Sequence, residues 1–240
     1  MTLVENTIVT ALKYGHKRQR LTELAQKRRE NTPENVNSIA DFYCGAYDTE
    51  WVSPYTKSAS NLNATVMVLL QDWASSEYLS KAFKPELVAL GLDTKLPTSR
   101  QLTALLARHF SLRLEDTFAT NLYPYIKSGS LSAAMTWQGL VDSAKRYALP
   151  QVNIVAPQVV ICLGLNVFNA LSVANGGARY KRLGLAIQSP FAIALESGQC
   201  CYVYAQAHTG FHGQTSRNRG DSKQVELDWA HMSEQLAMAV

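Results

Sequence analysis

The chain has 240 residues, of which 47% are hydrophobic and 18% are charged. This composition supports a folded domain with a sizeable core and excludes a disordered chain. The longest apolar runs have the length of a strand and fall short of the roughly 18 residues of a membrane span. The net charge of +4 is only mildly basic, so charge alone is weak evidence for a polyanionic partner.

The N-terminus and the cysteines indicate a cytoplasmic protein. No charged leader followed by an apolar stretch opens the sequence, so we expect no secretory signal. The four cysteines are Cys44, Cys162, Cys200 and Cys201. They form no Cys-x-x-Cys pair, and two of them lie in apolar runs where a thiol packs as a small hydrophobe. A disulfide framework or a metal cluster is therefore not expected, and a reducing compartment fits better.

The first quarter of the chain divides into two segments. Residues 3–30 are expected to form a basic helix with a thin apolar stripe of Leu21, Leu24 and Ala25. Crowded positive charge of this kind is more often a solvated helix face than a binding surface. Residues 31–63 are polar, aromatic and rich in turn residues, which predicts a long surface segment that is a candidate to pack partly over a sheet edge. Loops of this length are often functional.

From residue 64 onward, strand-like and helix-like segments alternate. Strands are expected at residues 65–70, 118–122 and 159–163, and a hairpin at 191–195 and 200–205. Helices are expected at residues 85–90, from 98 or 99 to about 109, 137–148 with Pro150 as the stop, 165–174, and from about 225 onward. The alternation predicts one α/β domain over residues 1–240, a three-layer α/β/α sandwich with a central, mostly parallel four-stranded sheet.

Three polar residues stand at the ends of predicted strands: Asp72, Asn121 and His208. Each has an ordinary structural explanation, because Asp caps turns, Asn bonds its own backbone and a single His is usually structural. Ligands of an open parallel sheet bind outside the carboxyl ends of its strands. The joint placement of the three residues therefore predicts one shared pocket.

The order and spacing of these segments resemble the uracil-DNA glycosylase superfamily over roughly residues 50–220. That family carries Gly-Gln-Asp-Pro-Tyr after the first core strand, an Asn after the next strand and a late His-Pro-Ser-type loop. This chain has Gln71-Asp72, then Thr120-Asn121, then His208 to Gly213. Each motif is weak alone, and the ordered set is moderately specific.

The resemblance implies a role for each matching residue. Asp72 would orient or deprotonate the attacking water, or stabilise the oxocarbenium ion by its charge. His208 would hydrogen-bond the carbonyl oxygen that gains charge as the base leaves. The backbone of Gln71 would contact the base, and the Asn121 amide would bind the Watson–Crick edge of uracil. No metal or organic cofactor is implied.

Departures from the family pattern concern the base pocket. Trp73 stands where Pro is usual, and Ala74 stands where thymine-excluding members often carry Tyr. A small residue there predicts tolerance of 5-substituted uracils such as 5-hydroxymethyluracil. Tyr78 and Phe83 are both candidates to stack on the base.

The late loop departs as well. It lacks the Pro-Ser pair and a Leu wedge, so Phe211 is the candidate to intercalate between bases. Residues 209–219 are expected to form a loop that enters the minor groove, and Arg217 and Arg219 would bind phosphates.

The sequence thus predicts a monomeric, monofunctional enzyme that hydrolyses the N-glycosidic bond of flipped-out uracil in single- or double-stranded DNA, without a membrane partner. A non-catalytic DNA-binding or damage-sensing module on the same fold stays open as the alternative. A serine hydrolase has little support because Gly-x-Ser-x-Gly is absent. A dinucleotide-binding protein is also poorly supported, because no Gly-x-Gly-x-x-Gly follows the first strand.

Overall fold

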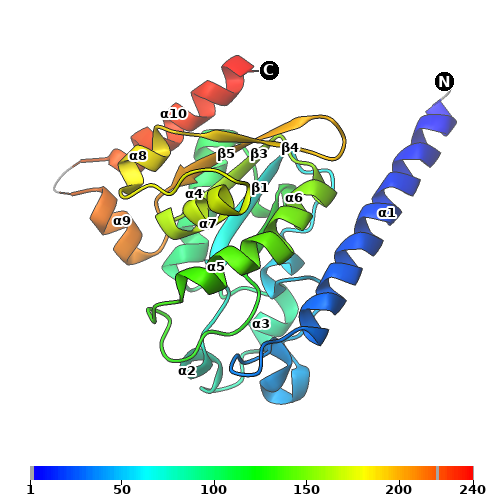
Figure 1. Cartoon of the computed structure of the whole chain (residues 1–240), viewed down its shortest axis with the longest axis vertical. Coiled ribbons are helices and arrows are strands. Elements are labelled where there is room, and N and C mark those ends of the chain that lie inside the picture. Colours follow the sequence, from blue (N-terminus) through cyan, green and yellow to red (C-terminus); the bar gives the residue numbers. More distant parts are fainter. Residues whose placement is uncertain (1–2, 220–221, 240) are drawn as a thin grey trace.

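The computed structural model describes the backbone of residues 3–219 and 222–239 and the side chains of residues 15–219 and 222–236. Within them the chain forms a five-stranded sheet in the order β2-β1-β3-β5-β4 (Figure 1). The strands are β1 (Val66–Asp72), β2 (Phe118–Tyr123), β3 (Val159–Leu163), β4 (Phe191–Ala194) and β5 (Cys200–Gln206). The first, second, third and fifth run parallel, and β4 runs antiparallel to β5.

The α/β class and the mostly parallel sheet are confirmed, and the strand number is wrong by one. The hairpin predicted at residues 191–205 forms, and Leu195 N–H donates to the Gln199 carbonyl at 2.8 Å across its turn. Because β4 pairs with β5 along the hairpin, it extends the same sheet instead of standing apart.

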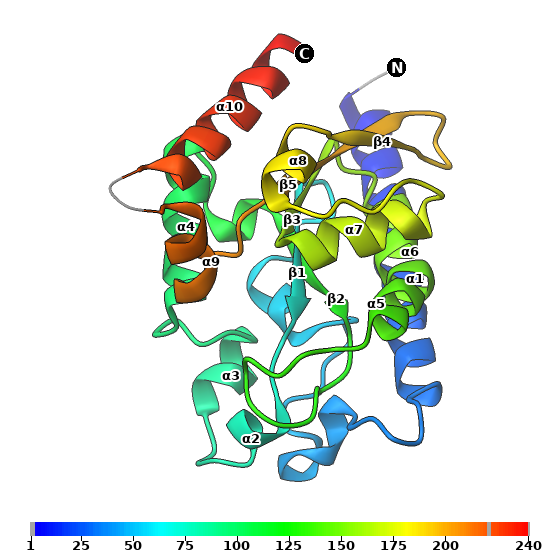
Figure 2. The same cartoon turned by 60° about the vertical axis from the view of Figure 1, so that its left-hand side comes forward.

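Helices surround the sheet on both faces. They are α1 (Leu3–Glu30), α2 (Ser76–Leu79), α3 (Pro85–Leu90), α4 (Pro97–Phe110), α5 (Trp137–Ser143), α6 (Leu149–Val155), α7 (Leu165–Ala174), α8 (Leu183–Ile187), α9 (Phe211–Arg217) and α10 (Gln224–Ala239). Figure 2 shows α4 and α10 on one side of the sheet and α5, α6, α7 and α1 on the other. The three-layer arrangement is the one that the alternation predicts.

The helix after β2 does not end before Pro150 as expected. A π turn at Ala144–Ala148 joins α5 to α6, and Pro150 occupies the first turn of α6. The Leu149 N–H bonds to the Ala144 carbonyl with the five-residue spacing of a π turn, so the regular hydrogen-bond pattern is already interrupted just before Pro150.

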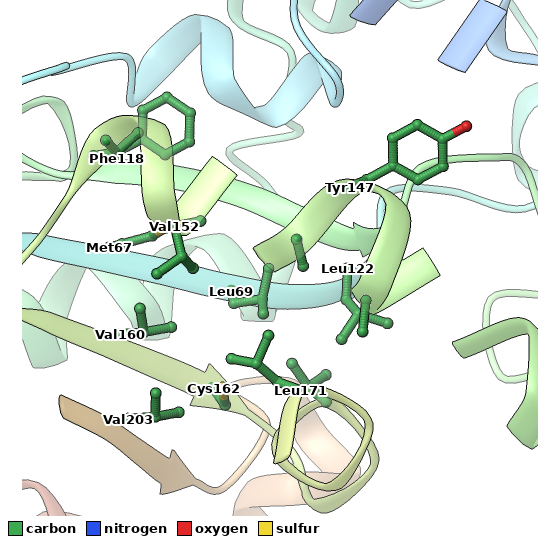
Figure 3. Close-up of a cluster of buried hydrophobic side chains, with 14 of the residues drawn as sticks. Met67, Leu69, Phe118, Leu122, Tyr147, Val152, Val160, Cys162, Leu171 and Val203 are labelled. Atoms are coloured by element: carbon green, nitrogen blue, oxygen red, sulfur yellow. The ribbon is translucent and has the colours of Figure 1, made fainter. Parts of the chain in front are cut away.

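Alternate side chains along each strand point to opposite faces of the sheet and pack in two separate hydrophobic cores. Met67 and Leu69 of β1 pack in the cluster under α5, α6 and α7, whereas Val68 and Leu70 pack in the cluster under α4 and α10. Figure 3 shows the first cluster, in which Met67, Leu69 and Cys162 of the sheet lie close to Val152 and Leu171 of the helices. Both faces of the parallel strands are thus buried, as their continuous apolar sequences require.

The basic helix α1 forms as predicted, and its charge is largely used within the molecule. Leu21, Leu24 and Ala25 are buried against the first cluster. Its basic side chains pair with distant acids: Arg18 with Glu50, Arg20 with Glu196, and Arg28 with Asp48. The α1 charge is therefore weaker as a polyanion-binding surface than the sequence implies.

The segment at residues 31–63 is more deeply packed than a surface loop. Its 3-10 turn at Pro54–Ser58 lies against β2, where the Thr56 hydroxyl donates to the Ala119 carbonyl at 2.8 Å. Tyr55 in the same turn is only 5% exposed. The segment thus brings residues to the sheet edge that carries the strand-end motifs. Across the described residues, no helix is both long and apolar enough to cross a bilayer.

Candidate active site at the carboxyl ends of the strands

The direction of winding reverses at β1. The chain passes from β1 to β2 on one side of it, and then crosses to β3 on the other side. A crevice opens at such a switch point, outside the carboxyl ends of the strands. Asp72, the last residue of β1, lines a cavity of about 670 Å³ together with Gly164 after β3 and His208 after β5. The convergence predicted for Asp72 and His208 is therefore present.

Lys127 holds the Asp72 carboxylate in place. Its ammonium lies 2.9 Å from one carboxylate oxygen of Asp72, and both side chains are nearly buried. The amide of Gln71 donates to the other oxygen at 3.0 Å. Sequence reasoning missed Lys127, although it follows β2 at the same sheet edge as the residues it selected. Each carboxylate oxygen keeps a lone pair for a further donor.

The proton of the neutral His208 ring is on Nε2. The backbone N–H of Gly210 donates to Nδ1 at 3.0 Å, so that nitrogen is an acceptor. Burial lowers the pKa of His208 below its ordinary value; Asp72 opposes the shift and Lys127 adds to it. At neutral pH the ring is therefore uncharged and has one donor, Nε2–H, available.

The segment after His208 is a short helix, not the loop expected at residues 209–219. Helix α9 starts at Phe211 and its backbone passes close to His208. A Cβ on Gly213 would lie 2.2 Å from the His208 carbonyl oxygen, and one on Gly210 would lie 2.9 Å from Nδ1. Glycine at both positions lets α9 approach the histidine and fix its ring.

A second, smaller cavity of about 180 Å³ adjoins the first. The two share Asp72, Tyr78, Leu131 and His208 in their walls. The remaining walls of the small cavity are mainly apolar, with the residues Tyr55, Leu70, Trp73, Leu87, Leu92, Asp93, Leu96, Thr98 and Ser99.

Three further predicted residues lie at these cavities. Gln71 lines the larger one. Trp73 lines the smaller one and is fixed by its indole N–H, which donates to the Gly91 carbonyl at 2.7 Å. Tyr78 lines both, and its hydroxyl donates to Asp93 at 2.6 Å.

Three others lie elsewhere among the described residues. Asn121 is fully buried and its amide oxygen accepts from the Ser53 hydroxyl at 2.5 Å. Ala74 is buried in the cluster around Ile39 and Leu79, and Phe83 is 46% exposed on the ring of Tyr47. None of the three lines either cavity. The premise that Ala74 leaves room beside a base is therefore not met.

The predicted DNA contacts have different surroundings. Phe211 is 68% exposed at the start of α9. Arg217 is held by two hydrogen bonds to Asp228, at 2.6 and 2.8 Å, so its charge is partly neutralised. Arg219 lines a groove with Lys181 and Arg182, and this groove shares Gly164, Leu165 and His208 with the cavity of Asp72.

The chemistry of the site comes from a carboxylate, an ammonium and a neutral imidazole. Among the side chains of residues 15–219 and 222–236, no group of three or more His, Cys, Asp and Glu is arranged to hold a metal ion. No protein-family model and no curated protein sequence matches this chain.

Proposed function

We propose that the protein hydrolyses the N-glycosidic bond of a uracil-type base in DNA and leaves an abasic site. One observation carries the proposal: Asp72 and His208, from the ends of β1 and β5, line the same cavity and a side pocket that adjoins it. A carboxylate and a neutral imidazole donor on opposite sides of a scissile bond are the groups that this hydrolysis requires.

In the proposed reaction, Asp72 and His208 each stabilise one of the two charges that develop as the bond breaks. As the bond between the sugar C1′ and the base nitrogen breaks, its electron pair passes to the base and the sugar becomes an oxocarbenium ion. The Asp72 carboxylate stabilises that cation and orients the water that adds to C1′. The His208 Nε2–H donates to the carbonyl oxygen on which the negative charge of the base gathers, and the water proton finally goes to the base. Lys127 and Gln71 are positioning residues, because they hold the carboxylate.

The groove beside the cavity supports a polymeric substrate. Lys181, Arg182 and Arg219 line it, and no described acidic side chain forms an ion pair with them. Unpaired cations along a groove bind a phosphate backbone. A free nucleoside would not need them, so DNA is the substrate class that accounts for both the cavity and the groove.

The test is a base-excision assay on single- and double-stranded oligonucleotides with one uracil. Wild-type protein should form abasic sites, and Asp72→Asn should lose most turnover while it still binds the oligonucleotide. Asp142→Asn, outside the cavity of Asp72, is the matched control and should retain full activity. His208→Gln should also lose activity with no loss of folding.

The alternative is a non-catalytic DNA-binding module, and the ion pair of Asp72 with Lys127 is the observation in its favour. A buried pair of this kind is often structural. If the wild-type protein binds DNA but forms no abasic site on any uracil substrate, this alternative replaces the glycosylase.

A further inference from the structure

An exposed aromatic patch lies outside both cavities of Asp72. It consists of Tyr43, which is 37% exposed, and Phe83, which is 46% exposed, and their ring centroids are 5.2 Å apart. Neither residue lines the two cavities, so neither contacts a base held there. Phe83 stacks on the buried Tyr47, with 21° between the ring planes. One face of the Phe83 ring is therefore covered, while almost half of its side chain remains open to a further planar group.

The rings of the patch are held in fixed positions. Tyr43 and Cys44 both adopt left-handed backbone angles, with φ of 51° and 54°, which are uncommon for residues other than glycine and cluster at functional sites. The Tyr43 hydroxyl donates to the Lys81 carbonyl, and the Lys84 N–H donates to the Tyr47 hydroxyl at 2.9 Å. The patch is therefore formed before any ligand binds, which reduces the entropy lost on binding.

Lys81 connects the patch to the larger cavity of Asp72. It lines that cavity and is exposed, and no described acid forms an ion pair with it. At its other end, the same cavity shares Gly164 and His208 with the groove of unpaired cations. In Figure 2, α8, which borders that groove, lies above β1, and α2, which ends two residues before Lys81, lies below it. Unpaired cations thus lie on both sides of Asp72, and the aromatic patch lies beside one of them.

We infer that the patch is a stacking platform for an unpaired base of single-stranded DNA, next to the nucleotide held beside Asp72. Every base has a π face, so stacking on an aromatic side chain tolerates any sequence. A base inside a duplex is covered on both faces by its neighbours, so only a base released from that stack reaches Phe83. The ammonium of Lys81 binds a phosphate of the intervening backbone. The inference rests on the proposed function and adds to it a preference for single-stranded substrate.

The test is a double-mutant cycle between the Phe83 ring and the bases of a single strand. Phe83→Leu retains an apolar side chain and removes the aromatic face. The oligonucleotide carries one 2′-fluoro-deoxyuridine, whose electron-withdrawing fluorine slows excision during the measurement. A tetrahydrofuran residue, which has no base, replaces each flanking nucleotide in turn. At one position this replacement should weaken binding to the wild-type protein by about fivefold or more and leave binding to Phe83→Leu unchanged.

Two further variants separate stacking from a structural role. Tyr202→Leu is the matched control, because Tyr202 is 45% exposed on β5 and lines neither cavity of Asp72 nor the groove. Phe83→Trp restores an aromatic face, and both variants should keep the wild-type dependence on that position. Phe83→Leu should leave duplex affinity and the salt slope unchanged, because stacking releases no counterions. A destabilised protein would instead lose affinity for every oligonucleotide alike.

The outcomes distinguish the platform from the glycosylase. Excision of uracil by a wild-type protein in which no flanking base couples to Phe83 would overturn the inference and leave the glycosylase standing. Coupling to one base without excision of uracil would support the platform and replace the glycosylase by the DNA-binding module. A wild-type protein that neither binds a single strand nor excises uracil would overturn both.

Discussion

Lys127 contributes to the electrostatics of the candidate site in two ways. It forms the ion pair with Asp72 and lowers the pKa of His208. Lys127→Met should therefore destabilise the fold by about 3 kcal/mol, because it leaves a nearly buried carboxylate without its cation. Urea unfolding measures the change. Lys81→Met, at an exposed position on the same cavity, is the control and should have an effect within about 0.5 kcal/mol. Equal stability of the two variants would mean that water already satisfies Asp72.

His208 should titrate below its ordinary pKa of 6.5, because burial disfavours the charged ring. Asp72→Asn should lower the value further by removing a favourable negative charge, and Lys127→Met should raise it. NMR titration of the ring resonances, assigned by their loss in His208→Gln, measures all three. A wild-type midpoint at or above 6.5 would contradict the buried, neutral ring.

The same shift links His208 to stability. As pH falls, the unfolded chain binds the proton near pH 6.5 and the folded protein only at a lower pH. Between these two values the unfolded state carries more protons, so stability is lost as pH decreases. His208→Gln should flatten that part of the pH dependence of unfolding.

For single residues, the sequence predicts the position along a strand better than the direction in which the side chain points. Asp72 and His208 line one cavity because the carboxyl ends of parallel strands meet at one edge. Asn121 lies in the neighbouring strand β2, two residues before its last residue, and its amide oxygen is bonded to the Ser53 hydroxyl. Tyr55 carried no strand-end signal, because it reaches the edge from a turn far earlier in the chain.

Among the elements, α9 depends on glycine for its approach to His208. The Cβ of Gly213→Ala would lie 2.2 Å from a backbone oxygen, so the helix has to shift. We expect at least a tenfold loss of uracil excision and a lower melting temperature, measured by single-turnover kinetics and calorimetry. Thr215→Ala on the exposed side of α9 is the control and should change neither. Normal excision by Gly213→Ala would show that α9 does not position the histidine.

The elements with a clear periodicity were predictable, and the irregular joints were not. The parallel strands are indicated in the sequence by apolar runs of strand length. The π turn at Ala144–Ala148 arises from hydrogen-bond slippage that leaves no residue pattern, so Pro150 was interpreted as a stop. The hairpin that contains β4 was visible in the sequence, but the membership of β4 in the sheet depends on strand pairing that sequence alone does not specify.

At the scale of the whole molecule, α1 is attached by a buried ion pair. Arg28 is fully buried against Asp48, whereas Arg18 and Glu50 form a pair whose side chains are each about half exposed. Asp48→Ala should destabilise the protein by about 3 kcal/mol, because it leaves a buried guanidinium without its counter-charge. Glu50→Ala is the matched control and should cost less than about 1 kcal/mol. Urea unfolding of both variants measures the difference, and equal losses would mean that Arg28 finds another partner.

The stretch of sequence richest in basic residues is not the part of the structure with the most unpaired positive charge. The first thirty residues hold the densest basic run, yet all four of its arginines are paired, with Glu50, Glu196 and Asp48. The groove beside His208 contains Lys181 and Arg182, which no described acid pairs. A run of charge in a sequence therefore says little about a binding surface until its partners are known.

The groove, not α1, should thus set the salt dependence of DNA binding. Each lost phosphate contact reduces the slope of log K against log salt by about 0.7 for single-stranded and 0.9 for duplex DNA. Lys181→Ala with Arg182→Ala should reduce it by between one and two, measured by fluorescence anisotropy over a salt series. Arg18→Ala with Lys27→Ala removes two charges from α1 and should leave the slope unchanged. The opposite result would mean that the backbone of the bound DNA follows α1, and that the groove holds something other than phosphate.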